Sequence, residues 1–290
     1  MRSIARGTAP RRSLLTDPRV RAWVFQVIAV LAVVAFGWDL FHNTQNNLAH
    51  RGITSGFGFL NNAAGFGISQ HLIDYTESDS YGRVFVIGLL NTLLVSAIGI
   101  VLATVLGFIL GVARLSPNWL ISKLATVYIE IFRNIPLLSL LILISFGLPD
   151  VGLVLPYFWC GVLGLTLSSA AFVCENVRSG IMAVSHGQTE AARSLGLRPG
   201  ITLRLVIIPQ ALRVIIPPLT SQYLNLAKNS SLAAGIGYPD MVSLFAGTVL
   251  NQTGQAIEVI AITMSVYLAI SISISILMNW YNKRIALIER

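Results

Sequence analysis

The fold of this chain is decided by the stretch Ser185-His-Gly-Gln-Thr-Glu190-Ala-Ala-Arg-Ser-Leu-Gly196-Leu-Arg-Pro-Gly200, a polar island between two long apolar runs. Ser185 and Gln188 stand at capping-box spacing, which predicts a helix start. Gly196 can take the left-handed conformation that ends a helix, and Pro199 is expected to block its resumption. We therefore predict a short helix within residues 186–200, held at a membrane surface and shaped for docking to another protein.

The composition is that of a membrane protein. Of the 290 residues, 54% are hydrophobic and 11% are charged, whereas a soluble domain carries about 25% charged residues. A span needs about 20 mostly apolar residues. We predict an all-α, polytopic membrane protein with about six transmembrane helices, at about 22–41, 84–113, 124–148, 152–177, 205–232 and 257–281.

The distribution of charge sets the expected orientation. The net charge is +8, and the cations cluster at the ends of the spans, where lipid headgroups and topology explain them better than a nucleic-acid partner does. Arginines crowd the region before the first span, so both termini and residues 186–200 are expected in the cytoplasm. Arg11-Arg12 also suggests a cleaved signal, but the apolar run that follows is long enough to be a retained helix.

These arguments divide the chain into five predicted parts. They are a cytoplasmic segment at 1–21, an N-terminal transmembrane helix at 22–41, a periplasmic or interfacial segment at 42–83, a transmembrane domain at 84–281 and a cytoplasmic tail at 282–290. The aromatic residues of 42–83, such as Phe57 and Phe66, fit either an element in the headgroup region or an ordinary loop.

The polar island carries a family resemblance. Glu190-Ala191-Ala192, Gly196 and Val206-Ile207-Ile208-Pro209 resemble the cytoplasmic signature of permease subunits of ABC importers. The rest of the chain, from about Gly52, resembles permeases for polar or general L-amino acids. The segments that carry this second likeness include Asn91-Thr-Leu, Ala113-Arg-Leu-Ser, Arg133-Asn-Ile-Pro136, Glu175-Asn-Val-Arg178, Gln222-Tyr-Leu-Asn225, Lys228-Asn-Ser-Ser231 and Met278-Asn-Trp-Tyr281.

The resemblance implies a core of five helices preceded by an additional N-terminal helix, in a bacterial inner membrane. It implies a transport subunit with no catalytic site, metal or cofactor of its own, and ATP-Mg bound by a partner ATPase. The further partners implied are a second permease subunit, identical or different, a periplasmic amino-acid-binding protein and membrane lipid. The residues implied in coupling to the ATPase are Glu190, Ala191, Ala192, Arg193, Gly196 and Pro209.

Span 205–232 contains candidates for the substrate path. Pro217-Pro218 predicts a kink near mid-membrane. Beyond it, Gln222, Asn225 and Asn229 fall on one helical face, with Lys228 close by. Polar side chains at membrane depth face a protein interior or a wet pathway. They either line a route for zwitterionic solutes or form hydrogen bonds between helices, with Lys228 reaching the outer surface.

A run of small residues in span 84–113 has two possible roles. Small residues at every fourth position, Gly99, Ala103, Gly107 and Gly111, suggest either a seam between permease subunits or packing within one subunit.

The charged pairs, the cysteines and the histidines are each expected to have a structural role or none. Glu130 with Arg133, and Glu175 with Arg178, are spaced to meet on a helix and are expected to neutralise each other. Cys160 and Cys174 lie about 21 Å apart along one helix, beyond disulfide reach. The four histidines are scattered, which predicts no metal cluster.

Two other functions fit a polytopic protein. An ion-coupled secondary transporter would favour paired ionisable groups at mid-membrane and an inverted repeat. A scaffold or receptor subunit would need neither the polar island nor the polar face of span 205–232. One departure from the longer general amino-acid permeases is the short connection 147–152, which is like that of the shorter polar amino-acid permeases.

Overall fold

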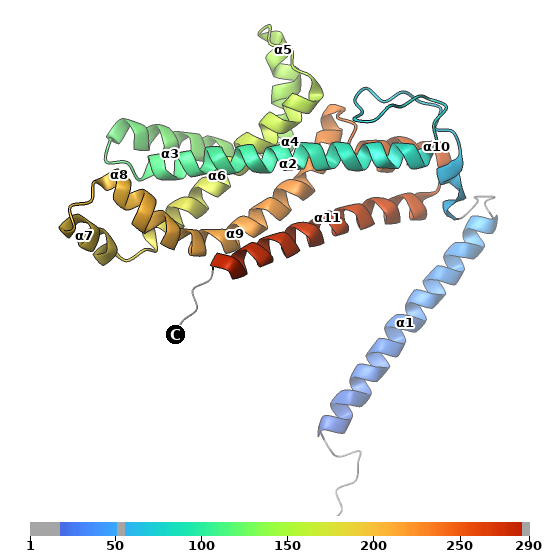
Figure 1. The fold of residues 1–290 in the computed structure, drawn as a ribbon. Helices are drawn as coiled ribbons and strands as arrows, with labels where there is room; N and C mark the ends of the chain where they lie inside the picture. The colour runs from blue at the N-terminus through green and yellow to red at the C-terminus, as the bar shows by residue number, and fades with distance from the viewer. Residues whose placement is uncertain (1–17, 51–55, 286–290) are drawn as a thin grey trace, which may run out of the picture. The chain divides into compact units, whose positions relative to one another are not determined.

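The computed structural model describes residues 18–50 and 56–285, in two units whose relative positions are not determined. The first unit contains α1 (Pro18–His50), of which Val20–Thr44 is long and apolar enough to cross a membrane. The second unit, from Phe57 onward, contains every other helix (Figure 1). No strand occurs in the described ranges, and the predicted all-α class is confirmed.

Four long helices form the frame of the second unit. They are α2 (Tyr81–Arg114), α6 (Tyr157–Met182), α9 (Ile208–Asn229) and α11 (Ala256–Ile285). Five helical stretches of the described chain, α1 among them, can cross a membrane, or six if one bent pair counts as a single span. Buried aliphatic side chains such as Val177 and Ile215 pack α6 against α9.

The span predicted at 124–148 corresponds to a bent pair of helical arms and not to one continuous helix. It consists of α3 (Trp119–Asn134) and a second arm made of α4 (Leu137–Ile142), the π-helical η3 (Leu143–Gly147) and α5 (Leu148–Asp150). The two arms are bent by 104°. Pro136 disfavours helical geometry at the preceding residue, and Ile135 is extended, with φ −86° and ψ 123°.

The small residues of α2 allow α6 to approach closely. A β-carbon at Gly111 would lie 2.7 Å from the Cβ of Val177, and Gly99 lies against Leu165 of α6 and Leu226 of α9. Of the two expected roles for these residues, the structure therefore supports packing within one subunit. Cys160 and Cys174 are buried and unbridged, as predicted.

The chain before α9 is irregular at its prolines. Pro199 was expected to block a helix, but it occupies the first turn of α8 (Pro199–Thr202), where its missing N–H costs nothing. The π-helical η4 (Leu203–Ile207) follows α8 and ends two positions before Pro209, which cannot donate a helical hydrogen bond. Helix α9 then continues through Pro217 and Pro218.

Two segments cover the end of the second unit that lies away from α7 (Figure 1). The first, here called the cap segment, is residues 57–80 and begins with the 3-10 turn η2 (Phe57–Asn61). The second, the connecting segment, is residues 230–255 and contains η5 (Ser230–Ile236), η6 (Val242–Val249) and α10 (Leu250–Thr253). Buried Phe59 belongs to the same apolar cluster as Met241 and Phe245. The cap segment is thus folded onto the helices and is not a free loop.

Candidate functional site

The predicted surface helix is present as α7 (His186–Ser194). The predicted capping box is not formed, because the side chain of Ser185 makes no capping bond. The side chain of Gln188 instead accepts a hydrogen bond from Nε2 of Gln210, at 3.2 Å. That bond ties α7 to α9 rather than closing the start of α7.

The end of α7 is a Schellman motif centred on Gly196. Gly196 has φ +77°, in the left-handed region that favours glycine. Its N–H donates to the carbonyl of Arg193 at 2.8 Å, and the N–H of Leu197 donates to Ala192 at 3.1 Å. The prediction that Gly196 ends this helix in the left-handed conformation is confirmed.

One face of α7 is free of the rest of the second unit. Ala192 is buried, whereas Ala191 and Arg193 are exposed. Leu195, just beyond the helix, is 81% exposed. Glu190 is exposed and lies 3.0 Å from Nδ1 of His186, one turn earlier. The outward surface of α7 therefore combines a carboxylate, a guanidinium and an apolar side chain.

A groove of about 750 Å³ lies beside α7. Its lining comes from the ends of α2 and α6, from the α2–α3 connection and from α7–α8, and includes Pro117, Met182 and Arg193. Thr202 also lines it, and its buried hydroxyl has no partner in the described chain. Together, α7 and this groove form a surface with a projecting helix and an adjacent concavity at one end of the second unit.

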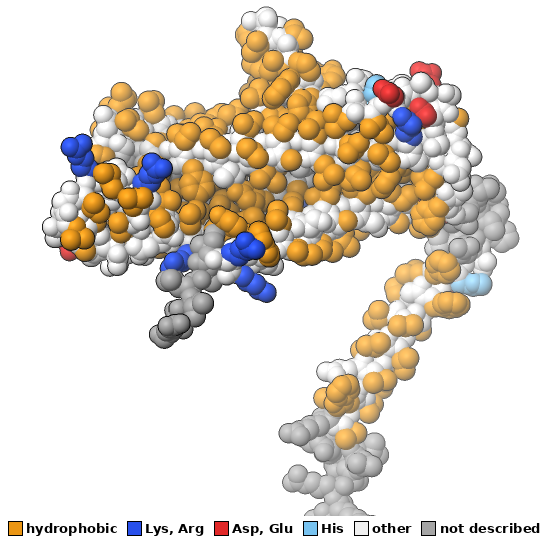
Figure 2. Space-filling view, viewed as in Figure 1, with side chains coloured by type: hydrophobic (Ala, Val, Ile, Leu, Met, Phe, Trp, Pro, Cys, Tyr) orange, Lys and Arg blue, Asp and Glu red, His pale blue; other side chains and the backbone are white. Residues whose placement is uncertain are grey.

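Charge is segregated between the two ends of the second unit. In the visible face of Figure 2, most Lys and Arg side chains lie toward α7 and the C-terminal end of α11, and most acidic side chains lie at the cap segment, beside a basic group. The flanks between them are largely hydrophobic. In membrane proteins, Lys and Arg are enriched on the cytoplasmic side.

The polar residues of α9 form an exposed stripe. Asn225, Lys228 and Asn229 are exposed, and Gln222 is half-buried. Within the described ranges, no hydrogen bond or ion pair involves the side chains of these four residues. The neighbouring Tyr223 turns inward, and its hydroxyl lies 2.8 Å from Oγ1 of Thr104 on α2. The helical repeat thus places the predicted path residues on one face of α9, whereas the predicted coupling residues lie in α7, just after it and at the start of α9.

Glu175 is the centre of an ion-pair cluster that only partly matches the predicted pairs. Arg178 lies 3.2 Å from Glu175, as expected. Arg133 was expected to pair with Glu130 but lies 3.5 Å from Glu175 instead. Arg114, from the last turn of α2, also binds Glu175. The cluster joins α2, α3 and α6, and spacing along a single helix could not reveal this convergence of three helices.

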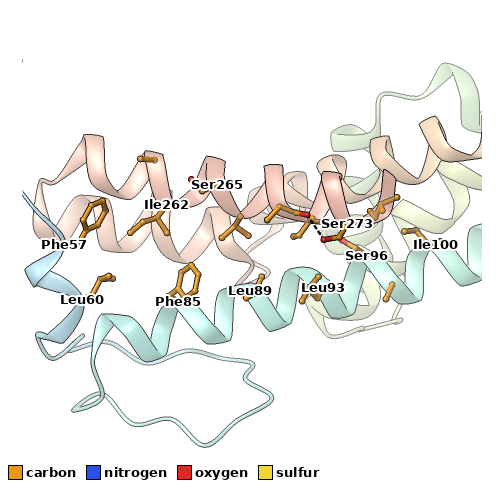
Figure 3. Close-up of a pocket in the computed structure, with 16 residues that line it drawn as sticks. Phe57, Leu60, Phe85, Leu89, Leu93, Ser96, Ile100, Ile262, Ser265 and Ser273 are labelled. Carbon is orange, nitrogen blue, oxygen red and sulfur yellow. Dashed lines mark hydrogen bonds between the residues drawn. The ribbon is translucent and has the colours of Figure 1, made fainter. Parts of the chain in front are cut away.

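A second groove, of about 740 Å³, runs between α2 and α11 (Figure 3). Leu89 and Leu93 of α2 and Ile262 of α11 are among the mostly aliphatic and aromatic lining residues. The few polar groups that line this groove are serine hydroxyls. The hydroxyl of Ser96 is buried and has no hydrogen-bond partner in the described chain. A surface this apolar is a poor route for a charged solute.

A protein-family model matches residues 103–287, and its description is "binding-protein-dependent transport system inner membrane component". This match covers more than half of the chain, including α7, α9 and the Glu175 cluster. The chain belongs to this family of inner-membrane transport components.

Full-length relatives of this inner-membrane component are also found. It is 49% identical to the putative amino-acid ABC transporter permease protein YhdX of Escherichia coli (strain K12), over 98% of this chain and 99% of the relative. It is 38% identical to the general L-amino acid transport system permease protein AapQ of Rhizobium johnstonii, over 96% of each chain. The alignment to YhdX runs over 390 positions, so that relative contains sequence with no counterpart in the 290 residues here.

Solved structures share the fold of this inner-membrane component. A chain from the structure titled "Crystal structure of an amino acid ABC transporter with histidines" is 34% identical, with a TM-score of 0.65, over 70% of this chain and 95% of that one. A chain of the MetNI methionine ABC transporter is 21% identical, with a TM-score of 0.62, over 71% of this chain and 97% of that one. The second likeness shows the fold alone.

Sequence reasoning missed two buried polar groups of this inner-membrane component. Asn91 and Asp240 are both fully buried. The sequence patterns include Asn91 only as part of a resembling motif and assign no role to Asp240. Their signal in the sequence is polarity within apolar surroundings. Asn91 bonds to carbonyls 21 and 148 positions away, and Asp240 accepts from the nearby N–H of Ser243 and from Tyr267, 27 positions away.

Proposed function

We propose that this chain is the permease subunit of an ATP-driven importer of amino acids. The observation that carries the proposal is the family's Glu190-Ala-Ala…Gly196 signature folded as an exposed surface helix with a left-handed glycine end. Family membership and the near-complete alignment to an amino-acid ABC transporter permease support the transport role.

The proposed coupling surface is the outward face of α7 with Pro209 at the base of α9. Glu190, Arg193 and Leu195 can each be reached by a partner without moving the rest of the chain. A separate ATPase would hold ATP-Mg, close on ATP binding and push against α7. Because Gln188 is bonded to Gln210 of α9, a displacement of α7 would be passed to the helix that carries the polar stripe.

The proposed route runs along the exposed stripe of α9. Asn225, Lys228 and Asn229 would be costly against lipid. A second permease subunit placed opposite α9 would remove them from lipid and enclose a polar path. Amide and ammonium groups suit a zwitterionic solute, because they can bond both to its carboxylate and, through the amide oxygens, to its ammonium group.

The proposed orientation places α7 in the cytoplasm and the cap segment outside. The charge segregation seen in Figure 2 supports it. A soluble amino-acid-binding protein would then meet the surface that contains the cap segment. The substrate class proposed is polar or general L-amino acids, supported by the names of the relatives.

Transport by purified proteins tests this proposal. The chain would be reconstituted in proteoliposomes with the ATPase, permease and binding-protein products of its neighbouring genes, and radiolabelled L-glutamine and L-glutamate would be supplied. The expected result is uptake that requires enclosed ATP and persists when ionophores collapse ion gradients. Uptake driven by an ion gradient without ATP would favour a secondary transporter, and absence of uptake with every partner present would favour a scaffold.

A further inference from the structure

One buried amide joins the two segments that cover the outer end of the second unit. Asn91 of α2 is fully buried. Its Nδ2 donates to the carbonyl oxygen of Gln70 in the cap segment at 2.9 Å, and to that of Pro239 in the connecting segment at 2.8 Å. The opposite amide orientation would place oxygen against both carbonyl oxygens, so the contacts themselves assign the nitrogen. Both donors of the amide are therefore used, one on each segment.

Residues 238–241 are seated closely on α2 around this amide. The hydroxyl of Tyr238 donates to the main-chain oxygen of Asn91 at 2.9 Å, and the N–H of Met241 donates to Oγ1 of Thr92 at 3.0 Å. Gly88 allows this approach, because a β-carbon there would lie 3.2 Å from Cα of Met241. The connecting segment is thus fixed to α2 at the level of Asn91.

The same residues are tied to α11 on their other side. Oδ2 of Asp240 accepts a hydrogen bond from the hydroxyl of Tyr267 at 3.1 Å. The connecting segment begins directly after Asn229, the last residue of the polar stripe. A change in the position of residues 238–241 would therefore alter the outer end of the proposed route.

The cap segment is internally braced. The N–H of Ala64 donates to the carbonyl of Asp79 at 2.8 Å, and that of Gly65 donates to Glu77 at 2.9 Å. The Tyr75 hydroxyl donates to the carbonyl of Phe66 at 2.7 Å. Because of these cross-links, a displacement of its exposed surface is carried through the segment to Gln70 and is not absorbed locally.

We propose that Asn91 is a positioning residue that passes displacements of the cap segment to residues 238–241, at the outer end of the route. The role of Asn91 in transport rests on the proposed function. The link between the cap segment and residues 238–241 does not, because it is made by contacts within this chain. A soluble partner that presses on the cap segment would thereby change the outer end of the route through one amide group.

A double-mutant experiment on the co-expressed assembly in detergent tests the link without requiring transport. Tyr75→Phe removes a brace of the cap segment that does not touch Asn91. Asn91→Asp keeps the side chain's shape, but a carboxyl has at most one proton to donate and so cannot bond both carbonyls. Hydrogen exchange would be followed by mass spectrometry in peptides from residues 237–245. We expect Tyr75→Phe to raise exchange there about threefold or more in the wild-type background and to have no added effect with Asn91→Asp.

Ser96→Ala is the matched control. It changes another buried polar residue of α2, whose hydroxyl has no partner within the described ranges. In this background, Tyr75→Phe should therefore still raise hydrogen exchange in residues 237–245. Asn91→Leu, uncharged and of similar size, is the second variant. The proposal would be overturned if Tyr75→Phe raised hydrogen exchange in residues 237–245 equally in the wild type and in the Asn91 variants. It would also be overturned if Tyr75→Phe had no effect on that exchange in the wild type. Failure of both Asn91 variants to assemble would also overturn it, because Asn91 would then be a purely structural residue.

ATP hydrolysis by the same assembly gives the functional readout. If the proposed function holds, both Asn91 variants should keep basal ATPase activity and lose about tenfold or more of the stimulation by binding protein loaded with L-glutamine. Normal stimulation would contradict the link. If the wild-type assembly shows no stimulation, the proposed function fails while the exchange experiment still decides the role of Asn91.

Discussion

Gly107 of α2 and Val173 of α6 are in such close contact that a β-carbon at Gly107 would lie 2.5 Å from the Cβ of Val173. The same β-carbon would lie 3.0 Å from the carbonyl oxygen of Ala170. Neither neighbour is the flexible end of a long side chain, so the two helices would have to separate. We predict that Gly107→Ala lowers the free energy of unfolding by about 1–3 kcal/mol. Thermal unfolding of the purified subunit in detergent measures this change.

Gly161→Ala on α6 is the matched control for that substitution. Its β-carbon would meet Ala233 at 3.6 Å and Val95 at 3.7 Å, which is ordinary contact. We expect little change or a small gain in stability, because alanine is the better helix former. Equal losses in the two variants would show that the α2–α6 contact is looser than described.

The orientation predicts which introduced cysteines react from outside intact cells. Ser78 of the cap segment and Ser194 of α7 are both exposed. A membrane-impermeant thiol reagent should label Ser78→Cys and spare Ser194→Cys until the cells are opened. Cysteines at Ser3 and Ala286, which lie outside the described residues, should behave like Ser194→Cys. Labelling of Ser194→Cys in intact cells would reverse the orientation and remove the basis for ATPase coupling.

The stripe on α9 predicts substrate-dependent effects. Asn225→Leu removes one hydrogen-bonding group from the proposed route, a loss of about 1–3 kcal/mol, or about five- to 150-fold in uptake. We expect the loss to differ between L-glutamine and L-glutamate, while the yield of complex with the ATPase stays normal. Uptake that falls equally for both, in step with lost complex, would instead identify Asn225 as a packing residue.

Asp240 predicts a pH-dependent stability. Burial raises the pKa of this carboxyl to about 7. Because the folded-state pKa lies above the unfolded value of about 4, the carboxyl's contribution to stability is full in acid and is lost as the pH rises through 7. Unfolding free energy should fall by about 1 kcal/mol between pH 6 and 7 and change little above pH 8, and Asp240→Asn should abolish that fall. An unchanged pH profile in Asp240→Asn would assign the effect to other groups.

Local patterns predicted local structure well. Gly196 ends α7 because the sequence signal, a glycine after a run of helix formers, is the same feature that the backbone requires. The break at Pro136 could have been found, since a proline biases its predecessor away from helix, but the apolar run around it suggested one continuous span. Ser185 shows the converse case: correct capping-box spacing did not produce the capping bond.

Contacts between residues far apart along the chain could not be predicted from the sequence patterns. Pro239 is 148 positions from Asn91, and Arg114 is 61 positions from Glu175. Such pairs depend on which helix faces meet, and hydrophobic periodicity leaves this open when a helix is apolar all round. The stripe of Gln222, Asn225 and Asn229 was visible because it needs only the helical repeat.

ATP-driven uptake by the Gly196→Val variant tests the central claim most directly. Gly196 has φ +77°, a conformation that valine resists, so the docking surface should be deformed while the spans stay inserted. Gly200→Ala, which has no positive φ and meets nothing within 4 Å, is the matched control. Uptake of L-glutamine by proteoliposomes should fall to background in Gly196→Val and stay normal in Gly200→Ala, at equal permease abundance. Unimpaired ATP-driven uptake by Gly196→Val would contradict coupling through α7.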